Sequence, residues 1–255
     1  MTILITGAST GIGTSFAEEY AKRNHNLVLV ARSEDKLQAL AKRLSGAHGI
    51  SAHVFVQDLS KPDSAEKVVQ FCDEKNLQID LLVNNAGFGM LGDFLSHELS
   101  RLEQMVTLNV LTLMKLSRLF ATKFAERKSG GIINVASTAA FQPVPSMAVY
   151  AATKAFVLSF SEAIAFELKE KGVRVMALCP GGTDTPFFDN ANYERSKLMI
   201  PLEKPEDVVK TCIEGYERGE TVVVSGLMNK LMVNSSRFVP RGLVTAIAGS
   251  IFKKQ

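Results

Sequence analysis

The sequence lacks tryptophan, has only three cysteines and shows no large excess of one charge. Its 29 Lys and Arg residues nearly balance 26 Asp and Glu residues, and the basic residues are scattered. That balance argues against a nucleic-acid-binding protein. The thiols of Cys72, Cys179 and Cys212 are odd in number and lack metal-ligand spacing. We therefore expect three buried free thiols in a reducing compartment, and no metal site.

Long hydrophobic runs are also missing. No stretch reaches the ~18 apolar residues that cross a bilayer. Residues 2–6 are too short for the apolar part of a signal peptide, and a glycine follows at once. We expect a cytoplasmic protein that neither is secreted nor spans a membrane. Hydrophobic residues make up 46% of the 255 residues, which is enough for the core of one large domain.

Short apolar runs alternate with segments of helical period. The expected strands are Ile3–Thr6, Leu27–Ala31, Ser51–Val56, Leu81–Asn84, Ile132–Val135, Val173–Leu178 and Thr221–Val224. The expected helices are Ile12–Asn24, Glu34–Leu44, Ser64–Lys75, Glu98–Lys128, Val149–Lys171 and Pro205–Arg218. This alternation predicts an α/β fold with a doubly wound parallel sheet of about seven strands, a Rossmann fold. Ligands of such sheets bind at the carboxyl ends of the strands.

A glycine-rich turn follows the first expected strand. It contains Gly7, Gly11 and Gly13 in the spacing Gly-x-x-x-Gly-x-Gly, and a helix begins there. Glycines at this place let the backbone approach a pyrophosphate at the positive end of the helix. Any tight turn between a strand and a helix also favours glycine, but the position at the first strand favours a dinucleotide site.

The second expected strand ends in Ala31, Arg32 and Ser33. An acidic residue here would favour NAD by binding the ribose 2′-hydroxyl. Arg32 favours NADP instead, because a guanidinium can bind a 2′-phosphate with two hydrogen bonds, and Ser33 could add a donor. The alternative is that Arg32 is a solvated charge.

The segment from Tyr150 to Lys154 places a phenol and an ammonium four residues apart, on one face of a helix. A free phenol has a pKa of about 10. We expect a nearby ammonium and a cationic cofactor ring to lower it by about three units, so that Tyr150 can exchange a proton with a substrate oxygen. Alone, such a pair is common on ordinary helices.

Ser137 and Asn109 are two further candidates. Ser137 follows an expected strand and could bind the substrate oxygen, or it could simply be a turn residue. Asn109 lies inside the long expected helix Glu98–Lys128, where asparagine is unfavourable. It could hold a water, bend the helix or be a tolerated polar residue.

Taken together, these motifs resemble the short-chain dehydrogenase/reductase family, in its compact single-domain branch. The matching residues are Thr6, Gly7, Gly11, Ile12 and Gly13, then Asp58-Leu59, Asn84-Asn85-Ala86-Gly87, Asn109, Ser137, Tyr150 with Lys154, and Pro180-Gly181 with Thr185. They occur in family order and extend over the chain to about Val224. The resemblance implies one catalytic and dinucleotide-binding domain over residues 1–225. Residues 226–255 are then a C-terminal amphipathic helical extension.

The resemblance also implies roles. Tyr150 would be the acid/base, Lys154 would lower its pKa and hold the nicotinamide ribose, Ser137 would orient the substrate oxygen, and Asn109 would hold a water in a proton relay. The implied cofactor contacts of NADP(H) are Gly7, Ser9, Thr10, Gly11, Ile12, Gly13, Arg32, Ser33, Asp58, Leu59, Asn85, Ala86, Gly87, Tyr150, Lys154, Pro180, Gly181, Thr183 and Thr185. Thr10 departs from the pattern, because NADP-preferring members often have a basic residue there.

The expected activity is hydride transfer between NADP(H) and a small carbonyl or alcohol substrate. One alternative is a cofactor-sensing binding protein without turnover, which need not retain all four catalytic residues. Another is a nucleotide-sugar isomerase or dehydratase, against which the short length and the glycine spacing argue. The long helices resemble those through which family members form homodimers or homotetramers.

Two further segments bear on partners. Residues 186–201 are expected to cover the substrate. Phe187, Phe188 and Met199 in them suggest an apolar or extended one, but packing within this segment explains them equally well. Phe88, Met90, Phe141 and Val144 could line the same cleft. In the tail, apolar residues from Leu243 to Phe252 form one helical stripe next to Lys253 and Lys254. The stripe could cover the protein's own core or a partner subunit, or it could lie on an anionic membrane surface.

Overall fold

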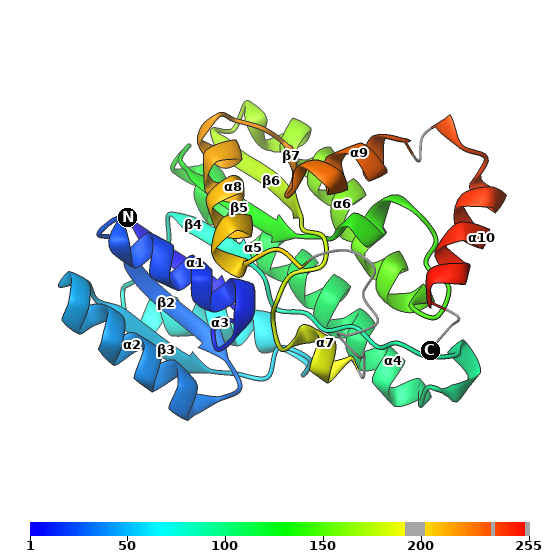
Figure 1. Ribbon diagram of the computed structural model, residues 1–255. Coiled ribbons are helices and arrows are strands. Elements are labelled where there is room, and N and C mark those ends of the chain that lie inside the picture. Colours follow the sequence, from blue (N-terminus) through cyan, green and yellow to red (C-terminus); the bar gives the residue numbers. More distant parts are fainter. Residues whose placement is uncertain (192–201, 236–237, 253–255) are drawn as a thin grey trace.

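A computed structural model of the chain describes residues 1–191, 202–235 and 238–252. Seven parallel strands form one sheet in the order β3-β2-β1-β4-β5-β6-β7 (Figure 1). The strands are β1 (Thr2–Thr6), β2 (Asn26–Ala31), β3 (Ala52–Val56), β4 (Leu81–Asn84), β5 (Gly130–Val135), β6 (Val173–Cys179) and β7 (Val222–Val224). The predicted doubly wound sheet of the Rossmann type is confirmed, and each strand agrees with its expected range to within two residues.

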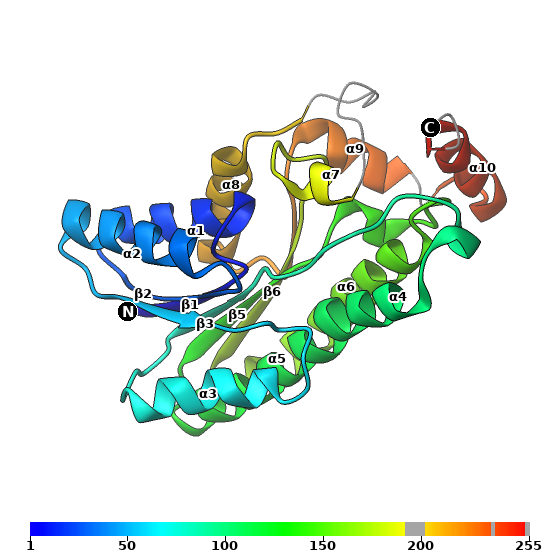
Figure 2. The same cartoon turned by 90° about the horizontal axis from the view of Figure 1, so that it is seen from below.

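Helices cover both faces of this sheet. One face carries α1 (Gly11–Lys22), α2 (Glu34–His48) and α8 (Pro205–Glu217), and the other carries α3 (Ser64–Glu74), α4 (Leu99–Val106), α5 (Leu113–Glu126) and α6 (Ala148–Lys169), as Figure 2 shows. Coverage on both sides explains the Val, Ile and Leu content of the strands, because their side chains have no solvent face. Leu27 to Val30 in β2, for example, are fully buried.

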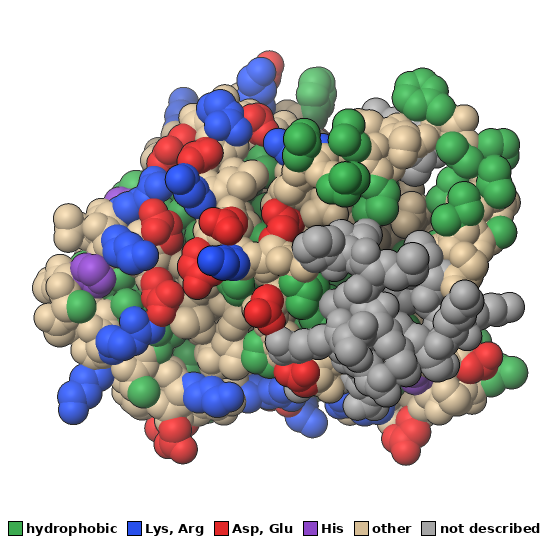
Figure 3. Space-filling model, viewed as in Figure 1, with side chains coloured by type: hydrophobic (Ala, Val, Ile, Leu, Met, Phe, Trp, Pro, Cys, Tyr) green, Lys and Arg blue, Asp and Glu red, His purple; other side chains and the backbone are tan. Residues whose placement is uncertain are grey.

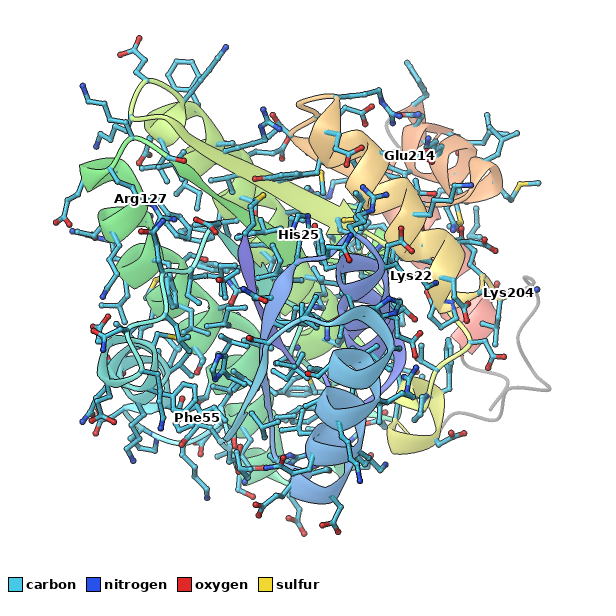
Figure 4. All side chains as sticks on the ribbon, turned by 90° about the vertical axis from the view of Figure 1, so that its left-hand side faces the viewer. Lys22, His25, Phe55, Arg127, Lys204 and Glu214 are labelled. Atoms are coloured by element: carbon cyan, nitrogen blue, oxygen red, sulfur yellow. The ribbon has the colours of Figure 1, made fainter. Side chains whose placement is uncertain are left out.

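The edge strand β3 is only half buried. Seen from this edge, Phe55 of β3 lies on the same side of the sheet as α3, whereas Lys22, Lys204 and Glu214 lie on the side of α1 and α8 (Figure 4). The Phe55 ring stacks on Phe71 of α3 with 4.6 Å between centroids. This contact packs the edge strand β3 against α3.

A chain of buried polar side chains crosses the middle of the sheet. Asn84 Nδ2 donates hydrogen bonds to Ser117 Oγ at 3.0 Å and to Asn134 Oδ1 at 2.9 Å. Asn134 Nδ2 in turn donates to Ser161 Oγ at 2.9 Å. These bonds link β4 and β5 to α5 and α6, so Asn84 has a structural task.

The long helix expected over residues 98–128 is interrupted in its middle. Between α4 and α5 lies a π-helical segment, η2 (Thr107–Thr112), and the buried Asn109 stands inside it. Short π-helical insertions widen a helix by one residue and are frequent at functional sites. The unfavourable asparagine thus marks a real irregularity.

The sequence reading missed several short elements. They are the 3-10 turns η1 (Phe94–Ser96) and η3 (Thr138–Phe141), and the helices α7 (Phe187–Asn190) and α9 (Leu227–Ser235). A last helix, α10 (Arg241–Phe252), agrees with the expected tail stripe. Of the segment expected to cover the substrate, residues 192–201 lie outside the described residues, and so do Arg237, Lys253 and Lys254 of the tail.

By length and hydropathy, α6 could span a membrane, and among the described helices it is the one that could. Its buried face, which includes Tyr150, Lys154 and Ser161, packs into the protein, and the helix lies against β6. We interpret α6 as a core helix.

Candidate active site

The site lies where strand order reverses between β1 and β4, at the carboxyl ends of the strands. The turn after β1 is held by left-handed glycines, with φ of 66° at Gly7 and 56° at Gly11. A Cβ on Gly13 would stand 2.1 Å from the Gly7 oxygen, so the turn closes only with glycine there. Within the described residues no side chain caps the first amides of α1 after Thr10, and the first turn has no acidic residue. These amides can therefore bind an anion.

The end of β4 is tied to this turn. Thr6 Oγ1 accepts hydrogen bonds from the backbone amides of Asn85 at 2.9 Å and Ala86 at 3.0 Å. The side chain of Asn85 donates to the Thr6 oxygen at 3.0 Å and to the Gly7 oxygen at 3.2 Å. Asn85 and Ala86 thus stand beside the glycine turn, as the motif predicts.

The ends of β2 and β3 lie on the other side of the turn. Arg32 and Ser33 are exposed, and Ser33 precedes α2. Burial alone would raise the pKa of Asp58, but two hydrogen bonds from Ser60 and the charge of Arg32 outweigh it and lower that pKa. The side chain of Leu59 is buried in the core, and its oxygen accepts a hydrogen bond from Thr112 Oγ1 at 2.7 Å, so its expected cofactor contact stays a prediction.

Tyr150 and Ser137 meet at the end of β5. Tyr150 lies in the first turn of α6, and Ser137 directly precedes η3, where its Oγ accepts from the Ala139 amide at 3.1 Å. Burial raises the pKa of Tyr150 to about 12, and a hydrogen bond with Ser137 offsets part of that rise. The expected lowering of this pKa is not found in the protein alone, because desolvation of the phenolate dominates.

Lys154 lies one helical turn beyond Tyr150, with its Nζ 5.8 Å from the centre of the Tyr150 ring. Its Nζ donates to the Val135 oxygen at 2.7 Å. Burial lowers the pKa of Lys154 to about 8, although the nearby Cys179 raises it slightly. The ammonium is therefore held at the end of β5, beside the phenol.

Asn109 reaches the same place from η2. Its amide binds the backbone of Phe88 and donates to Thr153 Oγ1 at 3.1 Å. A Cβ on Gly87 would lie 3.0 Å from Asn109 Oδ1 and 3.6 Å from Lys154 Nζ, so Gly87 lets the two side chains approach the loop after β4. These contacts give the Asn109 side chain a positioning task, and its role in a water relay stays a prediction.

The loop after β6 packs against the glycine turn. A Cβ on Gly11 would stand 2.9 Å from Thr185 Cγ2, so the loop and the turn are in close contact. Thr183 and Thr185 are buried, and Thr183 Oγ1 donates to the Gly181 oxygen at 3.2 Å. The Pro180 oxygen accepts from the Thr138 amide at 2.9 Å, which ties this loop to the end of β5.

Sequence reasoning missed the support of this loop by α9. Asn229 is buried, and its Nδ2 donates to Glu203 Oε2 at 3.0 Å and to the Ser225 oxygen at 2.9 Å. A Cβ on Gly181 would stand 2.2 Å from Asn229 Nδ2. One asparagine in a short helix gives no signal in the sequence, because its partners come from three separate segments.

A shallow hollow, partly open to solvent, adjoins the Tyr150 side chain. It is lined mainly by apolar residues, with His97 as its titratable side chain besides Tyr150; the lining is Met90, Gly92, Phe94, His97, Leu102, Met105, Ser146, Met147, Ala148, Val149 and Tyr150.

Of the residues expected at the cleft, Met90 lines this hollow. Phe88 and Phe187 pack in the same apolar cluster as Tyr150. Phe141 packs in a different cluster, and Val144 is buried.

Known proteins resemble this arrangement over nearly the whole chain. The model of the short chain dehydrogenase family matches residues 1–196. A short-chain dehydrogenase from Sphingobium yanoikuyae, solved in complex with NADPH, has a TM-score of 0.86 and 34% identity, covering 95% of this chain and 94% of that one.

Two relatives extend the comparison by sequence. A 7beta-hydroxysteroid dehydrogenase of Clostridium sardiniense is 30% identical over 98% of this chain and 94% of its own length. A very-long-chain 3-oxoacyl-CoA reductase of Rattus norvegicus is 35% identical over 93% of this chain and 75% of its own length. The chain therefore belongs to the short-chain dehydrogenase/reductase family, whose members are oxidoreductases that use nicotinamide cofactors.

Proposed function

We propose that this protein is an NADP(H)-dependent oxidoreductase that interconverts the carbonyl and alcohol forms of an apolar substrate. The observation that carries the proposal is the meeting of Tyr150, Ser137 and Lys154 at the end of β5, beside an apolar hollow and next to the uncapped glycine turn.

A nicotinamide cofactor would supply or accept the hydride. The chain's own groups handle the substrate oxygen. With a pKa near 12, Tyr150 is protonated at neutral pH, which is the form that donates a proton to a carbonyl oxygen. Ser137 lies within hydrogen-bonding reach of Tyr150 and can orient that oxygen. The adjacent Lys154 ammonium favours the phenolate left after donation, because opposite charges attract strongly in a buried site.

The residues present fit a dinucleotide. The uncapped amides of α1 suit its pyrophosphate, and the close approach of the backbone at Gly7 and Gly13 leaves no side chain in the way. Asp58 suits the adenine. Arg32 and Ser33 are exposed at the end of β2, where they suit a 2′-phosphate. The NADPH complex of the Sphingobium relative supports NADP as the preferred form.

The substrate class follows from the hollow beside Tyr150. Its methionine, leucine and valine side chains suit a bulky apolar ketone. The steroid and fatty-acyl compounds in the names of two relatives support this class. The buried free thiols Cys72, Cys179 and Cys212 fit a cytoplasmic location.

We also propose that the protein forms a homodimer or homotetramer. Large apolar side chains are exposed on the helices that pack on the α3 side of the sheet, namely Leu99, Leu111, Phe156 and Phe166. Such exposed apolar side chains suit burial against a second copy. Light scattering during size-exclusion chromatography measures the subunit number directly.

The activity is tested by following NADPH oxidation with a panel of bulky ketones and aldehydes, using Tyr150→Phe as the matched variant. We expect turnover by the wild type, a fall of at least about a hundredfold in the variant, and NADPH affinity within about threefold by calorimetry. Tight NADPH binding without turnover of any carbonyl or alcohol would instead indicate a cofactor-sensing protein.

A further inference from the structure

Six large apolar side chains stand out from the C-terminal part of the protein. They lie in α9, in α10 and just before α10, and are between 52% and 89% exposed: Leu227, Met228, Leu231, Phe238, Leu243 and Ile247. We refer to these six residues as the C-terminal plateau. Figure 3 shows hydrophobic side chains gathered over α9 and α10 on one side of the molecule. Scattered exposed apolar residues are ordinary, but a cluster of this size marks a binding surface.

The C-terminal segment that carries the plateau has charged side chains of one sign only. Residues 221–255 contain five basic residues and no acidic one, and without these five the chain would have more acidic than basic side chains. Lys230 and Arg241 are exposed beside the plateau. Glu203 lies next to α9, but its Oε2 accepts hydrogen bonds from Ser225 and Asn229. The surface therefore combines exposed apolar side chains with cations.

The C-terminal helices also adjoin the entrance of the hollow. A Cβ on Gly249 of α10 would lie 3.2 Å from Pro145 Cγ, and the following residues Ser146 and Met147 line the hollow. α9 lies beside η3, the turn that follows Ser137. A partner bound to the plateau would thus stand next to the proposed substrate site.

We propose that the C-terminal plateau docks the protein onto an anionic lipid surface. Exposed leucine and phenylalanine side chains gain free energy by entering the boundary between headgroups and acyl chains, and each nearby Lys or Arg adds attraction to anionic headgroups. A second copy of the chain suits the surface less well. A two-fold symmetric contact would place the same cationic segments against each other. Docking would also place the hollow beside the lipid phase, in which apolar ketones dissolve. This last point rests on the proposed function.

The test is co-sedimentation of the full-length protein with vesicles of phosphatidylcholine alone, and with vesicles that contain about one third phosphatidylglycerol. We expect binding to the anionic vesicles that falls with rising salt, and binding at least about tenfold weaker to the neutral ones. Leu231→Glu with Phe238→Glu should abolish binding. Lys230→Gln with Arg241→Gln should weaken it by roughly 25-fold, since each cation contributes a factor of about five.

Matched controls keep these results specific. Val56→Glu changes an exposed apolar residue at the end of the edge strand β3, and Lys67→Gln changes an exposed cation of α3; both should bind vesicles like the wild type. Far-ultraviolet circular dichroism and turnover of a water-soluble ketone report folding and activity separately from lipid binding. Equal sedimentation of the plateau variants and the wild type would overturn the proposal. The proposal would also be overturned if, in the absence of lipid, the wild type formed a larger oligomer than the plateau variants, because the plateau would then bind a second copy of the chain.

Discussion

The side chain of Asn109 forms hydrogen bonds with both the backbone amide and the backbone oxygen of Phe88. Its Nδ2 donates to the Phe88 oxygen at 3.0 Å, and its Oδ1 accepts from the Phe88 amide at 3.2 Å. The π-helical segment makes this possible, because it turns a side chain of the long helix toward the loop after β4. Asn109 therefore anchors the middle of the loop that carries Gly87 and Gly89 toward Lys154 and Tyr150.

Replacing Asn109 should consequently loosen this loop. Asn109→Ala leaves both Phe88 backbone groups and Thr153 without this partner, and we expect a loss of about 2–4 kcal/mol in the free energy of unfolding. Equilibrium urea denaturation measures it. Asn109→Asp retains the acceptor but not the donor, so an intermediate loss is expected. Gln38→Ala, on the exposed side of α2, should change stability by less than about 0.5 kcal/mol. Equal stability of Asn109→Ala and this control would show that the clamp is energetically unimportant.

The strand pattern and the order of motifs could be read from the sequence, because buried parallel strands are continuous apolar runs and the motifs follow strand ends. The π-helical interruption at Asn109 also had a signal in the sequence, because asparagine is unfavourable inside a helix. The ionisation of Tyr150 could not be read, since it depends on how deeply α6 buries the phenol. The support of the β6 loop by Asn229 and the packing of the Phe187 ring against Tyr150 could not be predicted either, because they join segments far apart in the chain.

Gly89 has no room for a side chain. A Cβ there would lie 2.7 Å from Phe187 Cζ and 3.0 Å from Tyr150 Cδ2, and the Phe187 ring packs on Tyr150 with 5.4 Å between centroids. Gly89→Ala should push the Phe187 ring away and cost about 1–3 kcal/mol of stability.

In Gly89→Ala the KM for a bulky ketone should change more than the affinity for NADPH, because most of the expected cofactor contacts lie at the glycine turn and at the ends of β2 and β3. Adding Phe187→Ala to Gly89→Ala should reverse part of the KM change, because the closer of the two contacts, with Phe187, is then removed. Gly46→Ala is the matched control, since nothing lies within 4 Å of its added methyl, and in helix α2 it should be neutral or stabilising. A normal KM in Gly89→Ala would mean that the Phe187 ring has no influence on substrate binding.

Arg32 should decide between the two nicotinamide cofactors. If its guanidinium binds the 2′-phosphate, Arg32→Ala loses a charge-assisted contact, and the Kd of NADPH should rise about 10- to 100-fold. The Kd of NADH should stay within about twofold, because NADH lacks that phosphate. Calorimetric titration with both cofactors measures the two values, and Lys42→Ala, an exposed cation of α2, is the comparison variant. Parallel weakening of both cofactors would assign Arg32 a general electrostatic role instead.

The buried ammonium of Lys154 makes stability depend on pH. Burial lowers its pKa from 10.5 to about 8. Below pH 8 the lysine is charged in both the folded and the unfolded chain, and the full cost of burying the charge weakens the fold. Between pH 8 and 10.5 the unfolded chain binds more protons than the folded one, so this cost falls as pH rises. The lysine's contribution to stability should thus improve by about 3 kcal/mol across that window.

The comparison of wild type with Lys154→Met isolates this contribution. Tyr150 and the buried cysteines titrate in both proteins, so their effects largely cancel in the difference between the two unfolding free energies. Urea denaturation from pH 7 to 10.5 should show the advantage of Lys154→Met over the wild type shrinking steadily above pH 8, whereas Lys171→Met, at an exposed lysine, should give a difference independent of pH. The hydrogen bond from Lys154 to the Val135 oxygen favours the charged lysine and therefore opposes the effect of burial on the slope. A flat difference for Lys154→Met would mean that the ammonium keeps its ordinary pKa in the fold, and that the Val135 oxygen compensates the loss of water completely.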